Sequence, residues 1–307
     1  MLGWVFPGQG SQFVGMGAGL ASGVARETFD IANDVVGRDI RSACLNGPDA
    51  VLGATEICQP AILTVSVAAA RSLEAVGLFP DVVAGHSVGE FAALVAARAI
   101  SFEDALRAIS ARADAMAAAG REMTGAMAAI LGLDREAVEA ACRATGRTVG
   151  VAAINGPSQI VISGERGAVD LAAESARNHG ARRVIPLDVS VAAHSLLMEP
   201  AKVGLREALD EVSIRAPRVP FVSCVVGRVV DDPIEIADLL CEALTCPVRW
   251  AETTRAMWDS AADRFYEVGP GKVLTGLMRG ILPEAEIAPV GHDDAIAELS
   301  GSFVGGR

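Results

Sequence analysis

The sequence predicts an α/β protein, in which a mainly parallel sheet is covered by helices and a smaller α/β unit is inserted. Two observations carry this prediction. Short apolar runs bounded by Gly or Pro alternate with long stretches rich in Ala and Leu, as strands alternate with helices in a parallel sheet. A segment in the middle of the chain departs from this alternation, because it places two strands in direct succession.

The predicted strands of the large unit are short and buried. Leu2–Phe6 ends in Pro-Gly-Gln-Gly, and Arg264–Val268 is closed by Gly-Pro-Gly. Val82–Ala84 and Phe221–Val226 are two further apolar runs of this kind. The helices expected between the strands are Gln59–Val76, Ser101–Ala118 and Ile234–Leu244.

The middle of the chain predicts a compact ferredoxin-like unit. Strand, helix, strand, strand, helix and strand follow one another at Gly125–Leu131, Asp134–Ala144, Gly150–Asn155, Gln159–Ser163, Gly167–Asn178 and Arg183–Val189. We therefore expect residues 122–189 to form an inserted small domain. Residues 1–121 and 190–307 would together form the large domain, since a tolerated insertion enters and leaves its host at neighbouring points.

Composition and charge exclude several classes of protein. The 307 residues are 51% hydrophobic and 4% aromatic, enough for a large core built from small aliphatic side chains. The formal net charge of -12 argues against a nucleic-acid partner, because phosphate binding needs a basic surface. No uninterrupted apolar run reaches about 18 residues, so no membrane span is expected.

The N-terminus and the cysteines favour a cytoplasmic location. MLGWVFPGQG has no basic residue and breaks at Pro7-Gly8, unlike a signal peptide. The six cysteines have no CxxC spacing, so we expect reduced thiols rather than disulfides or metal ligands. No pattern fixes the oligomeric state, and a monomer is the working expectation.

One short motif carries a candidate nucleophile, Ser87. The strand Val82–Ala84 leads directly into GHSVG at 85–89, and an Ala-rich stretch without Pro follows. Strand, sharp turn and helix with a serine at the apex is the nucleophile-elbow pattern G-x-S-x-G. The N-terminus of the helix behind the serine would favour negative charge developing there. The alternative is a structural turn or a helix cap with a satisfied hydroxyl.

A nucleophilic serine needs a base, and the chain has four histidines. His86 adjoins Ser87, but its side chain is expected to point away. His179 falls at a helix C-terminus and His292 in a polar tail. His194 follows the last strand of the inserted unit, where the chain returns to the large one, and is the favoured base. The alternative is a buried histidine satisfied by backbone groups.

The oxyanion of an acyl-transfer reaction needs N–H donors beside the nucleophile. Gln9 lies on the loop after the first strand, in FPGQGSQ. Its backbone N–H is a candidate donor together with that of Val88, the residue after the nucleophile. A simple polar turn at Gln9 is the alternative, and the two interpretations are equally weighted by the residues alone.

These motifs together resemble the malonyl-CoA:acyl carrier protein transacylases, a family related to the acyltransferase domains of polyketide synthases. The resemblance rests on FPGQGSQ at 6–12, GHSVGE at 85–90, Arg112 in AISARADAM, Asn155 in AINGPSQIVISG, His194 before SLLM, PVRW at 247–250 and YEVGPGKVLTGL at 266–277. It covers nearly the whole chain. It implies an α/β-hydrolase-like core with a ferredoxin-like insertion, in agreement with the order of elements above.

The resemblance also implies roles for particular residues. Ser87 would carry the acyl group as an ester, with His194 as its base and the N–H groups of Gln9 and Val88 around the oxyanion. Arg112 would bind the free carboxylate of the malonyl group, which a planar guanidinium matches in shape and charge. From the residues alone, Arg112 would be a solvated helix residue.

Three further positions are expected at the substrate: Asn155, Ala193 and Arg249. Many relatives have Gln in place of Arg249, and the backbone carbonyl at that position is implied to orient the histidine. Ala193 replaces the serine or phenylalanine that is common there. The side-chain selectivity therefore stays open, with malonyl expected to be preferred over methylmalonyl.

The substrates follow from the resemblance. Malonyl-CoA would donate the acyl group, and the phosphopantetheine thiol of an acyl carrier protein would accept it, with no permanently bound cofactor and no metal. An acidic carrier would need a local basic patch on this acidic protein, for which Arg182 and Arg183 are candidates and a solvated strand start is the alternative. Fatty-acid synthesis, polyketide synthesis and malonate decarboxylation all stay open as pathways.

Other classes of function stay open as well. The elbow motif also serves serine thioesterases and esterases of the α/β-hydrolase type, a related transacylase would use another acyl group, and a non-catalytic subunit is a third possibility. Ordinary α/β-hydrolases order their triad as Ser, acid, His. Here a whole inserted unit without an obvious acid separates Ser87 from His194. This separation favours acyl transfer.

Overall fold

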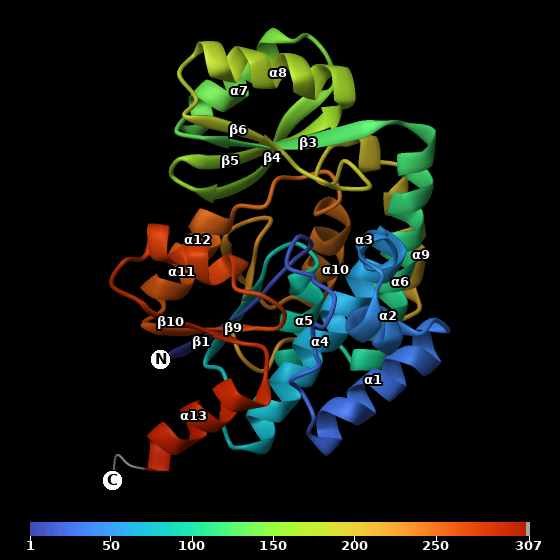
Figure 1. Cartoon of the computed structure of the whole chain (residues 1–307), viewed down its shortest axis with the longest axis vertical. Coiled ribbons are helices and arrows are strands. Elements are labelled where there is room, and N and C mark those ends of the chain that lie inside the picture. The colour runs from blue at the N-terminus through green and yellow to red at the C-terminus, as the bar shows by residue number, and fades with distance from the viewer. Residues whose placement is uncertain (305–307) are drawn as a thin grey trace.

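The computed structural model describes residues 1–304, and it contains two sheets (Figure 1). The larger sheet has the strand order β10-β9-β1-β2-β7-β8. Its strands are β1 (Leu2–Phe6), β2 (Val82–Gly85), β7 (Phe221–Ser223), β8 (Arg228–Val230), β9 (Arg264–Val268) and β10 (Glu286–Val290). Only the pairing of β7 with β8 is antiparallel, so the prediction of a mainly parallel sheet is confirmed.

Helices cover both faces of this sheet, because alternate side chains of a strand point to opposite faces. Trp4 and Phe6 of β1 belong to one hydrophobic cluster, and Val5 belongs to the other. The first cluster is built with α1 (Gly23–Val36), α2 (Ile40–Asn46), α3 (Asp49–Gly53), α4 (Thr55–Ala75), α5 (Gly89–Ala96), α6 (Phe102–Glu122), η1 (Leu196–Met198), α9 (Ala201–Asp210), α10 (Pro233–Glu242) and α13 (Asp293–Val304). On the second face lie α11 (Trp250–Asp259) and α12 (Val273–Ile281).

The smaller sheet is antiparallel and has the strand order β4-β5-β3-β6. Its elements, in chain order, are β3 (Gly125–Leu131), α7 (Arg135–Ala144), β4 (Val149–Gly156), β5 (Gln159–Glu165), α8 (Arg166–Asn178) and β6 (Arg183–Pro186). The first and last of these strands are antiparallel neighbours, so the chain enters and leaves this unit at one end. The helices α7 and α8 cover its outer side (Figure 1).

The two sheets share one of the two hydrophobic clusters. Ile130 of the small sheet belongs to the same cluster as Val5 and Ala84 of the large sheet. Backbone bonds reinforce this packing, since Ile154 N donates to Val248 O at 2.8 Å and Val248 N donates to Ala152 O at 2.9 Å. The small sheet is therefore fixed over the carboxyl ends of the parallel strands.

Two strands are shorter than the sequence predicts. The run expected over Phe221–Val226 leaves the sheet after Ser223, because a tight turn returns the chain as β8, with Gly227 at φ 66. The strand expected over Arg183–Val189 ends at Pro186, and the residues after it turn toward the large sheet. Within residues 1–304, no helix is both long and apolar enough to span a membrane.

Candidate active site

The turn between β2 and α5 places Ser87 at the carboxyl end of the central strands. Ser87 has φ 54, a left-handed conformation that non-glycine residues seldom adopt outside functional turns. Both glycines of the motif are required by close packing. A Cβ on Gly85 would lie 2.0 Å from the carbonyl carbon of Gly89, and one on Gly89 would lie 2.1 Å from Phe6 O. The helix can therefore start directly behind the serine.

His194 contacts the serine hydroxyl. Its Nε2 lies 2.8 Å from Ser87 Oγ, and its Nδ1 lies 3.1 Å from the carbonyl oxygen of Cys246. Because a carbonyl oxygen only accepts, Nδ1 carries the proton and Nε2 accepts from the hydroxyl. Burial, followed by the charge of Arg112, lowers the pKa of His194 to about 3, so the imidazole is neutral at physiological pH.

The carbonyl that orients His194 is not the one that the family resemblance implied. The expected contact came from Arg249, but the bond is made by Cys246, on the turn after α10. The carbonyl of Arg249 instead accepts from Thr253 N in the first turn of α11, and its side chain pairs with Glu252. Arg249 does not line the cavity around Ser87, so its expected place at the substrate is not observed.

Arg112 projects from the middle of α6 to the other side of the serine, and it is only 2% exposed. Its Nη2 lies 3.4 Å from Ser87 Oγ, and its Nη1 donates to Gln59 Oε1 at 2.5 Å. In residues 1–304 no carboxylate forms an ion pair with it. Burial lowers its pKa to about 10, against the opposing charge of Glu90, so the guanidinium stays cationic at neutral pH. A buried cation facing the serine suits an anionic acyl group.

Two residues that the sequence analysis missed support this arrangement. Gln59 of α4 holds Arg112 and is itself bonded to Thr55 Oγ1 at 2.7 Å. Glu90 is 1% exposed, and its Oε1 accepts from Cys224 N at 2.8 Å. Burial raises the pKa of Glu90 to about 7. The motif GHSVGE contained a signal for Glu90, three residues after the serine, whereas nothing local in the sequence pointed to Gln59.

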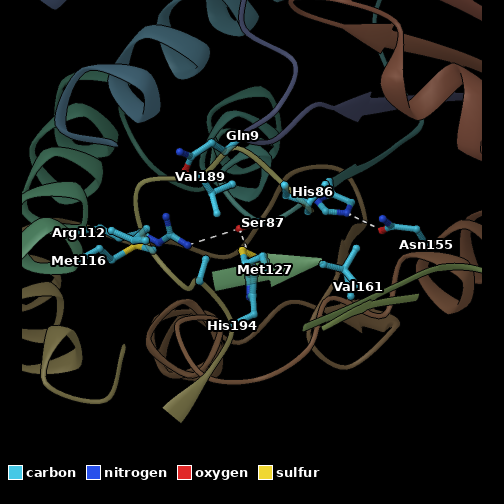
Figure 2. Close-up of a pocket in the computed structure, with 14 residues that line it drawn as sticks. Gln9, His86, Ser87, Arg112, Met116, Met127, Asn155, Val161, Val189 and His194 are labelled. Atoms are coloured by element: carbon cyan, nitrogen blue, oxygen red, sulfur yellow. Dashed lines mark hydrogen bonds between the residues drawn. The ribbon is translucent and has the colours of Figure 1, made fainter. Parts of the chain in front are cut away.

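A cavity of about 140 Å³ surrounds these groups, and its walls come from the small sheet, from α6 and from the loops after β1, β2 and β6 (Figure 2). Its lining residues are Gln9, His86, Ser87, Arg112, Met116, Met127, Ala153, Asn155, Val161, Leu187, Val189, Val191, Ala193 and His194. Figure 2 shows Ser87 between Arg112 and His194. The cavity is therefore mostly apolar, with polar groups converging on one hydroxyl.

Four other predicted site residues lie at or directly behind the cavity. Ala193 and Asn155 line the cavity, and His86 Nε2 donates to Asn155 Oδ1 at 2.9 Å. Gln9 lies on its wall and Val88 is buried behind Ser87; among the described residues, neither backbone N–H has an acceptor.

Arg182 and Arg183 are exposed where β6 begins, at the end of that strand away from the cavity. Leu187 on the cavity wall lies four positions after Arg183, roughly 13 Å along an extended chain. The structure therefore does not bring them to the cavity.

Comparison with known proteins agrees with this geometry. Residues 3–293 match the model of the acyl transferase domain, and the chain therefore belongs to the acyl transferase domain family. It is 42% identical over 283 residues to the malonyl CoA-acyl carrier protein transacylase of Bacillus subtilis, covering 91% of this chain and 89% of that protein. It is 40% identical over 299 residues to the transacylase of the same name from Escherichia coli strain K12, covering 96% and 97%.

Two solved structures are similar over almost their full length. The malonyl CoA-acyl carrier protein transacylase from Coxiella burnetii has a TM-score of 0.94 at 38% identity, covering 98% of this chain and 96% of that one. A malonyl-transacylase in complex with its type II polyketide synthase acyl-carrier protein has a TM-score of 0.95 at 38% identity, covering 98% and 99%.

Proposed function

We propose that this chain transfers a malonyl group from coenzyme A, through an ester on Ser87, to the phosphopantetheine thiol of an acyl carrier protein. One observation carries the proposal. A single serine hydroxyl lies between a neutral imidazole at 2.8 Å and, at 3.4 Å, a buried guanidinium that forms no ion pair with any described residue. The first group activates a nucleophile, and the second selects an acyl group with a carboxylate. The similarity to malonyl transacylases supports both parts.

In the first half-reaction, Ser87 Oγ attacks the thioester carbonyl of malonyl-CoA while its proton passes to His194 Nε2. The negative charge on the carbonyl oxygen is met by the backbone N–H groups of Gln9 and Val88. Collapse of this intermediate breaks the carbon–sulfur bond, and the coenzyme A sulfur leaves with the proton from His194. Arg112 holds the malonyl carboxylate throughout.

The second half-reaction runs in the reverse sense with a different thiol. His194 Nε2 takes the proton of the phosphopantetheine thiol, and the sulfur attacks the ester carbonyl of the malonyl group on Ser87. The carbon–oxygen bond to the serine breaks, and the proton returns from His194 to Ser87 Oγ. No group is oxidised or reduced, and no permanently bound cofactor or metal takes part.

The same proposal extends to the architecture. We propose that residues 1–121 and 190–307, the last three of which lie outside the described residues, form an α/β-hydrolase-like domain. Residues 122–189 form an inserted ferredoxin-like domain, which the strand order β4-β5-β3-β6 supports. A cytoplasmic location remains part of the proposal and rests on the sequence features alone.

The test is acylation followed by mass spectrometry. Incubation with malonyl-CoA should add the mass of one malonyl group to the intact chain, on the peptide that contains Ser87. Carrier protein added afterwards should take up this malonyl group, so that its own mass rises as the adduct on the chain disappears. Ser87→Ala should abolish the adduct while circular dichroism shows an unchanged fold. Rapid loss of the adduct to water without carrier protein would instead indicate a thioesterase. An adduct that persists in Ser87→Ala would refute the assignment of the nucleophile.

A further inference from the structure

A second hollow lies at the opposite end of the helices that build the active site, and arginines dominate it. Its volume is about 370 Å³, within the range of small-molecule sites, which run from about 300 to 1,000 Å³. It shares no lining residue with the cavity around Ser87. The eight residues of α5 separate Ser87 from this end of the helix by roughly 12 Å.

Four arginines line the hollow in a protein whose net charge is -12: Arg71, Arg98, Arg215 and Arg218. Backbone hydrogen bonds fix the main chain at two of these arginines. Arg215 N donates to Ala99 O at 2.8 Å, and Arg218 N donates to Ala97 O at 2.7 Å. In the part of the chain that the structure describes, neither guanidinium forms an ion pair. Both are exposed and available to a ligand.

The guanidinium of Arg71 is also without a carboxylate partner among the described residues. It lies 5.0 Å above the ring of Phe102, and it donates to Thr28 Oγ1 at 3.1 Å. These two neutral contacts fix the side chain and leave its charge uncompensated. Arg71 therefore adds a cation with a fixed side chain to the wall of the hollow.

Two acidic side chains, Glu103 and Asp104, also line the hollow. Both lie in the first turn of α6, where negative charge compensates the positive end of a helix. Asp104 is in addition paired with Arg107 at 2.6 Å, and Arg98 with Glu74 at 2.6 Å. Because the four arginines outnumber the acidic groups of the lining by two, the net charge of the lining is positive and favours an anion.

The backbone at Arg98 adopts an unusual conformation at the end of α5. Arg98 N donates to Val95 O at 3.0 Å and Ala99 N to Leu94 O at 2.9 Å, the paired bonds of a Schellman motif that ends α5. Arg98 has φ 60 and occupies the left-handed position at which glycine is usual. The side chain of this strained residue lines the hollow.

We propose that this hollow is a binding site for a phosphate-bearing small molecule, held by Arg71, Arg98, Arg215 and Arg218. Guanidinium groups bind phosphate oxygens in pairs of parallel hydrogen bonds, and several on one wall suit a group that carries more than one negative charge. The inference is independent of the proposed malonyl transfer, because no residue of the hollow takes part in that reaction.

The test is calorimetric titration of the full chain at constant ionic strength with inorganic phosphate, pyrophosphate, adenosine monophosphate and citrate. Saturable binding of phosphate and pyrophosphate is expected. Adenosine monophosphate binding more tightly than phosphate would point to a nucleotide, and equal affinity to the phosphate group alone; either supports the proposal. Citrate binding as tightly as pyrophosphate, or no saturable binding at all, would overturn it.

Variants separate binding from folding. Arg98→Gly should weaken pyrophosphate binding by roughly tenfold, as the loss of one charged contact does. Its melting temperature should change little, because glycine removes the cost of the left-handed backbone while the ion pair with Glu74 is lost. The double variant Arg215→Ala/Arg218→Ala should abolish saturation, whereas Arg255→Ala on the exposed face of α11 should bind normally. All of these variants should retain malonyl transfer, and equal weakening in Arg255→Ala would contradict the site.

Discussion

At the scale of single residues, buried charge explains most of the behaviour expected of the site. Arg112 and Glu90 are both almost fully buried, each contributes to the pKa of the other, and they form no ion pair within contact distance. Arg112 is thus left with an unused charge next to Ser87. In the proposed reaction, a substrate carboxylate would supply the partner that the described residues do not.

Replacement of Arg112 by alanine should therefore damage malonyl transfer selectively. The loss of a desolvated charge pair costs about 3–5 kcal/mol in kcat/KM for malonyl-CoA. Acetyl-CoA has no carboxylate to lose, so its transfer should be spared or improved. Steady-state kcat/KM values for malonyl-, methylmalonyl- and acetyl-CoA measure both effects. Similar losses for malonyl and acetyl groups, or an acetyl preference in the unmodified protein, would contradict the role of Arg112.

His194 should remain active at acidic pH, because its pKa lies near 3 rather than 6.5. A lowered pKa means that the neutral imidazole persists as the pH falls, and that it is lost only below about 3. The rate of acylation should then show no acid limb with a midpoint near 6.5. The dependence of the acylation rate on pH is best measured by stopped flow in Glu90→Gln. This variant lacks the buried carboxyl whose pKa is about 7, so Glu90 cannot add a second titration to the curve. A midpoint near 6.5 in that variant would refute the low pKa.

Glu90 should make the free energy of unfolding depend on pH. Its folded pKa, about 7, lies above its ordinary value of 4.5. Between these values the folded protein binds more protons than the unfolded chain, so stability falls as the pH rises, by roughly 3 kcal/mol in total, and is constant above pH 7. Urea unfolding at pH 5 and pH 8 should show this loss in the natural chain and not in Glu90→Gln. If the free energy of unfolding changed with pH equally in both proteins, the raised pKa of Glu90 would be ruled out.

At the scale of elements, close contact between backbones decides where the nucleophile lies. The start of α5 approaches the end of β1 so closely that only a glycine fits at position 89. This contact ties Ser87, which follows β2, to the loop after β1 that carries Gln9. The turn, the helix and two strands therefore form one rigid support for the reacting groups.

The variant Gly89→Ala tests this support. The added methyl group would overlap Phe6 O, so the free energy of unfolding should fall by about 1–3 kcal/mol or more, and acylation of Ser87 should slow sharply. Gly276→Ala in α12 is the matched control, because a Cβ there meets no atom within 4 Å. The control should gain about 0.5–1 kcal/mol from helix propensity and keep its activity. An unperturbed Gly89→Ala would contradict the geometry of the turn.

The sequence predicted best those elements whose boundaries are local. Leu2–Phe6, Gly125–Leu131 and Arg264–Val268 were predicted with the observed ends, because apolar runs bounded by Gly or Pro leave little choice. The strand at Phe221 was overextended, since Cys224 and Val225 are buried by tertiary packing outside the sheet. Apolar character shows that a residue is buried, but not in which element.

The candidate site shows the same division between local and long-range information. Ser87 and Gln9 could be singled out because each follows a strand within a recognisable motif. The Cys246 carbonyl beside His194 and the Gln59 amide beside Arg112 could not, because each contact joins residues more than fifty positions apart. Such pairs depend on how the helices and the small sheet pack, which no local pattern encodes.

At the scale of the whole molecule, an acidic protein has to receive a carrier protein expected to be acidic as well. Arg182 and Arg183 are exposed at the start of β6, and the chain that continues from this strand reaches the cavity wall at Leu187. The chain then continues to His194, so a carrier bound against the small sheet would lie beside the segment that leads to the proposed base. We retain these two arginines as the proposed docking residues.

Reversal of both charges should separate the two half-reactions. Arg182→Glu/Arg183→Glu should raise KM for the carrier protein several-fold at low salt, and less at high salt, because exposed charges are screened. Acylation of Ser87 by malonyl-CoA should be unchanged. Arg255→Glu is the control, because Arg255 on α11 is also an exposed arginine. Equal damage to both half-reactions, or an identical effect of the control, would exclude docking at β6.

The size of the cavity around Ser87 has a consequence for the lifetime of the ester. The cavity volume is only about 140 Å³. A malonyl group bound to Arg112, as we propose, would share this small space with any hydrolytic water beside His194. We therefore expect the proposed ester to be hydrolysed slowly, so that a slow arrival of the second substrate would waste few malonyl groups.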